Sequence, residues 1–224
     1  MKETRYKCLV ARRQSCHLCE GLENPADVAG GIFDSQEIGP WSRWQGNLHS
    51  RIMIIGQDWG SKNYFTKYKG IDANKNPTNV TLTKLLEYIG VRIWIADKNQ
   101  VDRGELFLTN AILCLKPGNM RSKLRDIWIE TCSKNYLKEQ IDIVSPKIII
   151  CLGKIAFDSL LMAIGHNIRY ERYRDVVEKK GGFSFRGWPR VFPVYHCGSN
   201  SNMNRPCPAQ IKDWENIRRF LGDV

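Results

Sequence analysis

Four short segments of the chain are apolar at almost every position. They span residues 51–56, 106–110, 147–153 and 190–196. A strand that is apolar on both faces is typical of a parallel sheet covered by helices on both sides. The pattern therefore predicts a central, mainly parallel four-stranded sheet.

Segments with helical spacing separate and follow these strands, over 79–90, 122–144, 153–165 and 207–222. The first begins at an asparagine, a common N-cap residue, and ends at a glycine, which is frequent after a helix. Strands and helices that alternate at this spacing indicate an α/β protein built as a three-layer α/β/α sandwich. We expect one domain over residues 1–224.

Two segments fall outside this alternation. Residues 20–50 read as a long loop or insertion that contains Trp41 and Trp44. Residues 166–190 mix basic and aromatic side chains around two adjacent glycines, and we predict a basic, hairpin-like segment there. Such a segment could contact nucleic acid through charge and stacking. A solvated hairpin with ordinary packing aromatics is the alternative.

The charge of the chain narrows the choice of partners. With 34 Lys and Arg against 23 Asp and Glu, the formal net charge is +11, which predicts attraction to polyanions, nucleic acid first. A charge that serves only solubility is the alternative. The sequence contains neither an apolar run long enough to cross a bilayer nor the apolar core of a signal peptide, so we expect a cytoplasmic protein, nucleoid-associated in a prokaryote.

In that compartment the eight cysteines are not expected to form disulfides. Cys16 and Cys19 form a CxxC pair, which can bind metal, act in redox chemistry or be coincidental. Cys114 follows the second strand and Cys132 lies on the next helix. Four thiolates from distant segments could converge on a metal site. Their spacing suits either a tetrahedral zinc or a [4Fe–4S] cluster and does not distinguish the two.

Polar side chains also follow three of the predicted strands. Asp58 lies in the turn after the first strand, Asn110 ends the second, and His196 ends the fourth. Each has an ordinary structural explanation: a helix cap, a turn residue or a packed histidine. Because ligands of such folds bind beyond the carboxyl ends of the strands, three such residues at one edge of the sheet predict a functional site.

These motifs resemble those of the uracil-DNA glycosylase superfamily. The segments "CHLC", "GQDWG", "TNAILCLKPGNM", "PKIIICLGKIA" and "PVYHCGS" follow the order found in its iron–sulfur branch, family 4, between residue 16 and about residue 205. The resemblance implies a DNA-repair glycosylase that flips uracil, or a related deaminated base, out of DNA and hydrolyses its N-glycosidic bond. It also implies that the four cysteines hold a structural [4Fe–4S] cluster, with zinc as the less favoured alternative.

The resemblance assigns roles to the residues at the strand ends. Asp58 matches the aspartate that positions water in family 1 enzymes, where family 4 has Ala or Pro. Asn110 matches the asparagine that binds the uracil edge, and His196 matches the histidine that contacts a base oxygen. Backbone groups at Gln57 and Asp58 are expected to complete the pocket, and Gly56 is expected to let the backbone approach the flipped base.

The chain departs from the family pattern at two places. The phenylalanine that stacks on the base in family 4 is replaced by Thr78, so Tyr64 or Phe65 is expected to take its part. The "HPS" of the second motif is "HCG" here. We expect a DNA-contacting loop after it, where Asn200 takes the place of the usual apolar wedge and Met203 is the alternative. The set of predicted DNA-contacting residues is Ser199, Asn200, Met203 and Arg205.

These departures leave two other functions open. One is a non-catalytic nucleic-acid-binding relative that keeps the fold and the metal cluster. The other is an enzyme that acts on a free nucleoside or another small ligand, against which the net charge argues. We expect the protein to act as a monomer.

Overall fold

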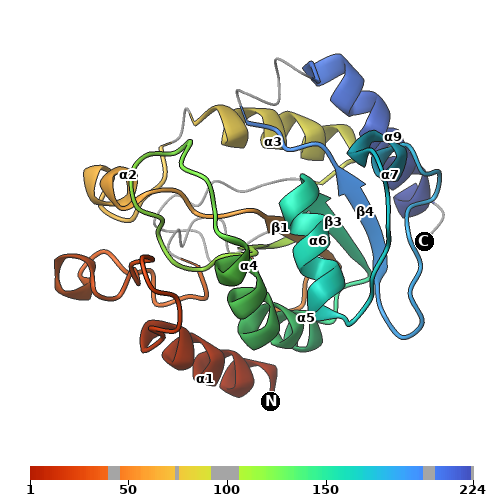
Figure 1. The fold of residues 1–224 in the computed structure, drawn as a ribbon. Coiled ribbons are helices and arrows are strands. Elements are labelled where there is room, and N and C mark those ends of the chain that lie inside the picture. Colours follow the sequence, from red (N-terminus) through yellow and green to blue (C-terminus); the bar gives the residue numbers. More distant parts are fainter. Residues whose placement is uncertain (40–45, 74–75, 92–105, 199–204, 223–224) are drawn as a thin grey trace.

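Four parallel strands form the central sheet of this computed structural model, which describes residues 1–39, 46–73, 76–91, 106–198 and 205–222 (Figure 1). The strands are β1 (Ile52–Gly56), β2 (Leu106–Asn110), β3 (Ile148–Leu152) and β4 (Arg190–Val194). Their order is β2-β1-β3-β4, and every neighbouring pair is parallel. The predicted sheet is confirmed, with strand ends that differ by at most two residues.

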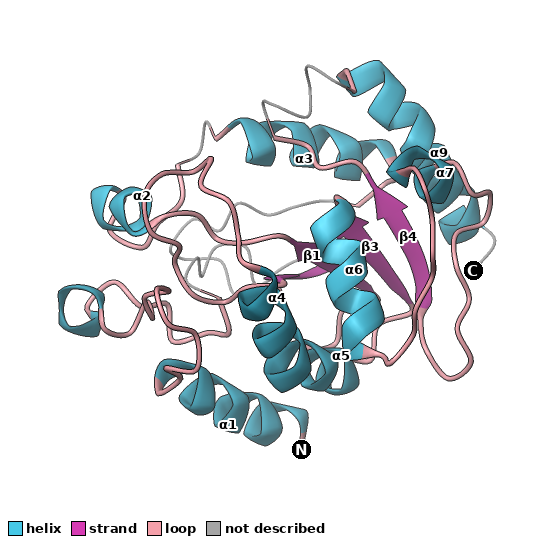
Figure 2. Cartoon of the chain, viewed as in Figure 1, coloured by secondary structure: helices cyan, strands magenta, loops and turns pink. Residues whose placement is uncertain are grey.

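Helices cover both faces of this sheet, which gives the predicted three-layer α/β/α architecture (Figure 2). Residues alternate along β1: Met53 and Ile55 belong to one hydrophobic cluster, Ile52 and Ile54 to the other. The first cluster is completed by α1 (Lys2–Gln14), α5 (Lys138–Val144) and α6 (Lys154–Ala163). The second is completed by α3 (Pro77–Tyr88) and α9 (Cys207–Gly222).

The segment predicted as one helix over 122–144 is divided. It comprises α4 (Asp126–Cys132), the π-helical turn η3 (Ser133–Leu137) and α5, which ends at the left-handed Ser145 before Pro146. The helix thus begins four residues later than predicted. A π turn inside an α-helix rotates the following side chains about the helix axis. A sequence pattern with a period of 3.6 residues does not reveal this rotation.

Helix α1 has no counterpart in the sequence-based prediction. It buries Tyr6, Leu9, Val10 and Arg13 on one face, at helical spacing. One of these four is an arginine, which weakened the apolar pattern. The buried guanidinium is compensated by the carboxylate of Asp34, to which it donates two hydrogen bonds of 2.7 and 3.1 Å.

The other predicted segments contain short elements. The 166–190 segment holds the helix α7 (Tyr173–Val177) and a single antiparallel bridge from Phe183 to Val191, rather than a two-stranded hairpin. The 20–50 segment holds the 3₁₀ turn η1 (Val28–Gly31) and is otherwise irregular where described, with Trp41 and Trp44 outside the described residues. Helix α2 (Lys62–Lys67) follows β1 and completes the part of the fold that surrounds the site. Among the helices of the described residues, none has the length and apolar composition needed to cross a bilayer.

Candidate functional site

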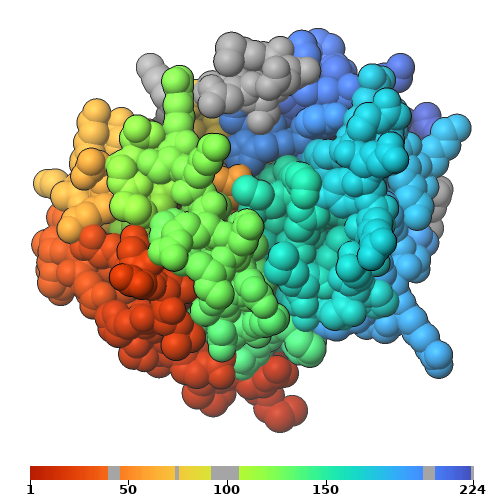
Figure 3. All heavy atoms as spheres, viewed as in Figure 1, coloured from red at the N-terminus to blue at the C-terminus, as the bar shows by residue number. Residues whose placement is uncertain are grey.

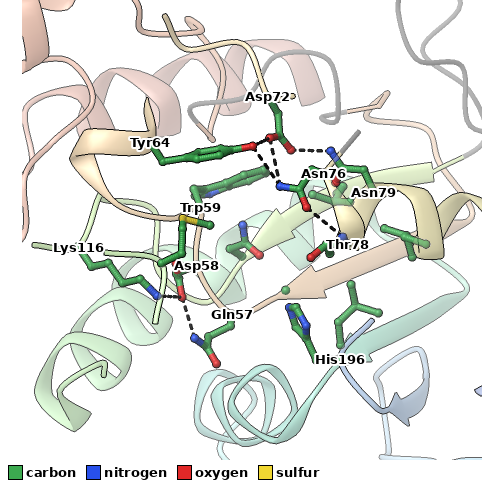
Figure 4. Close-up of a pocket in the computed structure, with 16 residues that line it drawn as sticks. Gln57, Asp58, Trp59, Tyr64, Asp72, Asn76, Thr78, Asn79, Lys116 and His196 are labelled. Carbon is green, nitrogen blue, oxygen red and sulfur yellow. Dashed lines mark hydrogen bonds and ion pairs between the residues drawn. The ribbon is translucent and has the colours of Figure 1, made fainter. Parts of the chain in front are cut away.

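The three polar residues expected at the strand ends line one pocket. Asp58, Asn110 and His196 come from the ends of β1, β2 and β4, and they border a cavity of about 180 Å³. Gly56, Gln57 and Tyr64 line it as well, so six of the seven residues predicted to surround the base meet there. Figure 4 shows His196 across this pocket from Tyr64.

The floor of the pocket depends on a glycine. Gly56 is paired in register with Asn110, and a Cβ atom at Gly56 would lie 2.0 Å from the Asn110 Oδ1 atom. The ladder between β1 and β2 continues past the strands, because Ala111 N donates to Gly56 O at 2.9 Å and Ile112 N donates to Gln57 O at 3.1 Å. The absence of a side chain at Gly56 therefore gives the Asn110 amide its place at the pocket floor.

The carboxylate of Asp58 receives three donors. Gly60 N donates to Oδ1 at 2.8 Å, while the Gln57 amide and the Lys116 ammonium donate to Oδ2 at 2.7 and 3.2 Å (Figure 4). The side chains of Asp58 and Lys116 are only 6% and 3% exposed. A buried carboxylate needs such compensation, because an unpaired charge in this environment is costly.

His196 is held as a neutral imidazole. Gly198 N donates to His196 Nδ1 at 3.0 Å, so the ring proton resides on Nε2 and makes that nitrogen a donor. Burial lowers the pKa of His196 and Lys116 adds to this effect, while Asp58 opposes it. The neutral form can donate a hydrogen bond to an oxygen of a bound ligand without carrying a charge.

A polar network forms the wall opposite His196. The Tyr64 hydroxyl donates to Asp72 Oδ1 at 2.7 Å, and the Asn79 amide donates to Asp72 Oδ2 at 2.6 Å. Asn76 donates to the Tyr64 hydroxyl at 3.2 Å. Burial, with Asp72 beside it, raises the pKa of Tyr64 to about 12, so the phenol stays protonated.

Phe65 does not line the pocket. It is completely buried in the hydrophobic cluster between the sheet and α3, and its ring centroid lies 6.4 Å from that of Phe33. The N-cap at Ser61, whose hydroxyl accepts from Tyr64 N, fixes the start of α2. Since neighbouring helical residues point about 100° apart, Tyr64 faces the pocket and Phe65 faces the core. Phe65 is therefore corrected to a core residue.

Several pocket residues were not singled out from the sequence as binding residues, namely Asp72, Asn76, Asn79, Lys116 and Met120. Asn76 had a local signal, because it precedes a proline as the N-cap of α3 and accepts from Thr78 N at 2.9 Å. Lys116 had no local sequence signal, because its position depends on how the loop after β2 folds back. Thr78, at the position where the family has phenylalanine, does line the pocket.

The four predicted metal ligands border one small cavity. Cys16, Cys19, Cys114 and Cys132 all line it. The N-terminal segment reaches the loop after β2 through two backbone hydrogen bonds between Glu23 and Leu115, of 3.0 and 2.8 Å. Figure 3 shows the N-terminal segment (red) directly against the green segment that carries this loop and α4.

The chemistry of these thiols fits a metal cluster. Burial, with Cys16 and Cys19 nearby, raises the pKa of Cys114 to about 12, and burial raises the pKa of Cys132 well above its usual value. Neighbouring buried thiols of this kind ionise together only when a cation compensates them. Within the described residues, no three Cys, His or acidic side chains are arranged to hold one metal ion.

Of the four residues predicted to contact DNA, the structure describes only Arg205. Ser199, Asn200 and Met203 lie outside the described residues. Arg205 is paired with Asp213 through both of its carboxylate oxygens, and its guanidinium lies 5.1 Å from the ring centroid of Tyr195. The side chain is 18% exposed. These contacts hold the start of α9 in place and make Arg205 a poor candidate for contacting DNA phosphates.

Comparison with known proteins identifies the family. Residues 44–218 match the uracil DNA glycosylase superfamily. The chain is 30% identical over 135 residues to the type-4 uracil-DNA glycosylase of Pyrobaculum aerophilum, covering 60% of this chain and 59% of that protein. It is 24% identical over 201 residues to the type-5 uracil-DNA glycosylase of the same organism, covering 85% and 81%. A type-4 enzyme of Saccharolobus solfataricus is 29% identical over 153 residues, covering 68% and 62%.

The chain thus spans less than two thirds of the length of these two type-4 relatives. The family match nevertheless extends over most of the chain and includes β1 through β4 together with Asp58, Asn110 and His196. The protein therefore belongs to the uracil DNA glycosylase superfamily.

Proposed function

We propose that the protein is a DNA glycosylase that hydrolyses the N-glycosidic bond of uracil, or of a related deaminated base, in DNA. The observation that carries this proposal is the convergence of Asp58, Asn110 and His196 on one pocket at the carboxyl ends of the strands. Such a pocket can accept a base only after the nucleotide has left the helical stack, so the proposal includes base flipping.

Asn110 is the proposed reader of the base. Its side chain is 6% exposed, and no hydrogen bond between described residues uses its amide. The amide offers one acceptor and a pair of donors. Uracil presents an N–H beside a carbonyl oxygen, whereas cytosine presents an acceptor nitrogen beside an amino group. An amide oriented by the close approach to Gly56 can discriminate between these two edges.

Asp58 and His196 are the proposed catalytic residues. Departure of the base leaves a cationic sugar and an anionic base. The Asp58 carboxylate would orient the attacking water and stabilise the cation. The neutral His196, whose Nε2 carries the proton, would donate to a base oxygen and stabilise the leaving anion. Backbone N–H groups at Gln57 and Asp58 would add to this stabilisation.

Cys16, Cys19, Cys114 and Cys132 are the proposed ligands of a structural [4Fe–4S] cluster. The support is their shared cavity and the raised pKa values of Cys114 and Cys132. When bound, the cluster would crosslink the N-terminal segment to the loop after β2 and to α4. Cys114 lies only four residues after Asn110 in the sequence, so the cluster would also support the base-reading strand end.

DNA that contains a deaminated base is the proposed partner, and the net charge of +11 supports binding to its phosphates. The test is a base-release assay on oligonucleotides that contain uracil, hypoxanthine or xanthine, single- and double-stranded. Release by the wild-type protein, abolished in Asp58→Ala, is the expected result. A purified protein with a complete cluster that releases none of these bases would contradict the proposal. Salt-sensitive DNA binding without base release would then favour a non-catalytic relative.

A further inference from the structure

Lys116 contributes an ion pair to the pocket that the roles assigned above do not use. Its ammonium lies 3.2 Å from Asp58 Oδ2, and both side chains are almost completely buried. In the part of the chain that the structure describes, it is the one basic side chain in a salt bridge with Asp58. Among the described residues His196 forms no salt bridge with Asp58, and its Nδ1 accepts from Gly198 N.

The backbone of Lys116 is fixed relative to Asp58. Lys116 N donates to Gly60 O at 3.1 Å, and Lys62 N donates to Lys116 O at 3.3 Å. Ser61 and Lys116 also form a parallel bridge. The loop after β2 is therefore joined to the segment that directly follows Asp58. The backbone segments that carry Asp58 and Lys116 are thus hydrogen-bonded to each other, which lowers the entropy cost of forming the ion pair between the two side chains.

The donors around Asp58 define the plane of its carboxylate. Gly60 N holds Oδ1, while Gln57 and Lys116 hold Oδ2. Only Lys116 brings a full positive charge. Without it, a carboxylate that is 6% exposed would remain beside one amide and one backbone donor. A carboxylate with so little compensation lowers its energy by turning toward solvent, away from its place in the pocket.

We propose that Lys116 is a positioning residue for Asp58: its ammonium holds this carboxylate in a fixed orientation in the pocket, and so supports the proposed water-orienting role. The inference rests on the proposed function. The Lys116 ammonium donates to Asp58 Oδ2 at 3.2 Å and is engaged by that hydrogen bond. Lys116 is accordingly assigned to orient Asp58 and not to attack the sugar as a nucleophile.

The decisive experiment is a double-mutant cycle under single-turnover conditions, with Lys116→Met, Asp58→Asn and the double variant. We expect Lys116→Met to lower the rate of base release about 10- to 100-fold, the loss expected for one charge-assisted hydrogen bond. DNA affinity should stay within about threefold, because a buried ammonium does not contact phosphates. In the Asp58→Asn background the same change should cost less than about threefold, since the partner charge is gone.

Lys134→Met is the matched control, because it removes the same charge from an exposed pair with Glu130 on α4 and should leave the rate unchanged. If Lys116→Met does not fold, Lys116→Gln keeps an N–H donor without the charge and replaces it in the cycle. Equal losses in both backgrounds would overturn the inference. So would a covalent protein–DNA adduct that borohydride traps in the wild type and not in Lys116→Met, which would identify Lys116 as a nucleophile. A wild-type protein that releases no base would overturn the proposed function itself, which distinguishes the two failures.

Discussion

Gly56 and Asn110 are register partners at the ends of β1 and β2, and no side chain fits between them. A Cβ atom at Gly56 would lie 2.0 Å from Asn110 Oδ1 and 3.2 Å from Asn110 Cγ. The strand backbone can accept an L-residue, because Gly56 does not have a positive φ. The requirement for glycine is therefore steric, and it concerns the side chain proposed to read the base.

Gly56→Ala should accordingly displace the Asn110 amide and leave the sheet intact. We expect base release to fall on the order of 100-fold, as for a misplacement of about 1 Å in a binding group, with the loss in kcat as well as in KM. Steady-state kinetics on a uracil oligonucleotide measures this. Gly222→Ala is the control, because a Cβ built there meets no atom within 4 Å beyond its chain neighbours and the backbone of its own helix. Unchanged kinetics in Gly56→Ala would show that Asn110 does not need this space.

The neutral state of His196 predicts a specific dependence of stability on pH. Burial lowers the pKa of His196 in the folded protein, while the unfolded chain binds a proton near the usual pKa of about 6.5. The unfolded state thus holds more protons below that pH, so the free energy of unfolding should fall as the pH decreases through about 6.5.

The measurement is urea denaturation between pH 7.5 and pH 5, with His196→Gln as the comparison. Glutamine keeps an N–H donor but does not titrate. The free energy of unfolding of His196→Gln should therefore increase relative to that of the wild type as the pH decreases. Base release by His196→Gln should exceed that by His196→Ala, which has no donor at all. A stability difference between wild type and His196→Gln that does not change with pH would contradict the neutral, buried imidazole.

The sheet and the meeting of the three strand-end residues were predictable because they depend on short-range pattern. Runs that are apolar at every position define buried parallel strands, and parallel strands bring their carboxyl ends to one edge. Asp58, Asn110 and His196 could be placed together on this basis alone. The CxxC of Cys16 and Cys19 was informative for a similar reason, since two ligands close in sequence are constrained to one location.

The features that could not be predicted depend on how loops fold back onto the sheet, or on the exact residue at which a helix begins. Lys116 reaches Asp58 because its loop joins the segment after β1, and no spacing in the sequence records that. Which of Tyr64 and Phe65 faces the pocket depends on the residue at which α2 begins. The N-cap at Ser61 sets that start. Arg13 interrupts the apolar face of α1, and its partner Asp34 is 21 residues away in an irregular loop.

The different environments of Tyr64 and Phe65 predict opposite phenotypes. Phe65→Ala removes a fully buried ring and should lower the free energy of unfolding by about 3–5 kcal/mol. Tyr64→Phe removes the hydrogen bond that the hydroxyl donates to Asp72 and the one that it accepts from Asn76, and should cost only about 2 kcal/mol. Urea denaturation of both variants measures this, together with KM for the uracil substrate. Tyr64→Ala should raise KM through loss of the pocket wall, and a Phe65→Ala variant of normal stability would contradict the assignment to the core.

The four cysteines predict a visible absorption. A [4Fe–4S] protein is brown because its thiolate–iron bonds absorb visible light, and Cys16→Ala should lose both the colour and about four irons per chain. Cys8→Ala is the matched control, because Cys8 is an exposed residue of α1 and does not line the cysteine cavity. Since the proposed cluster joins the N-terminal segment to the loop after β2, Cys16→Ala should also increase proteolysis near residues 15–25. A colourless wild-type protein with one zinc per chain would exclude the iron–sulfur cluster but keep the crosslink.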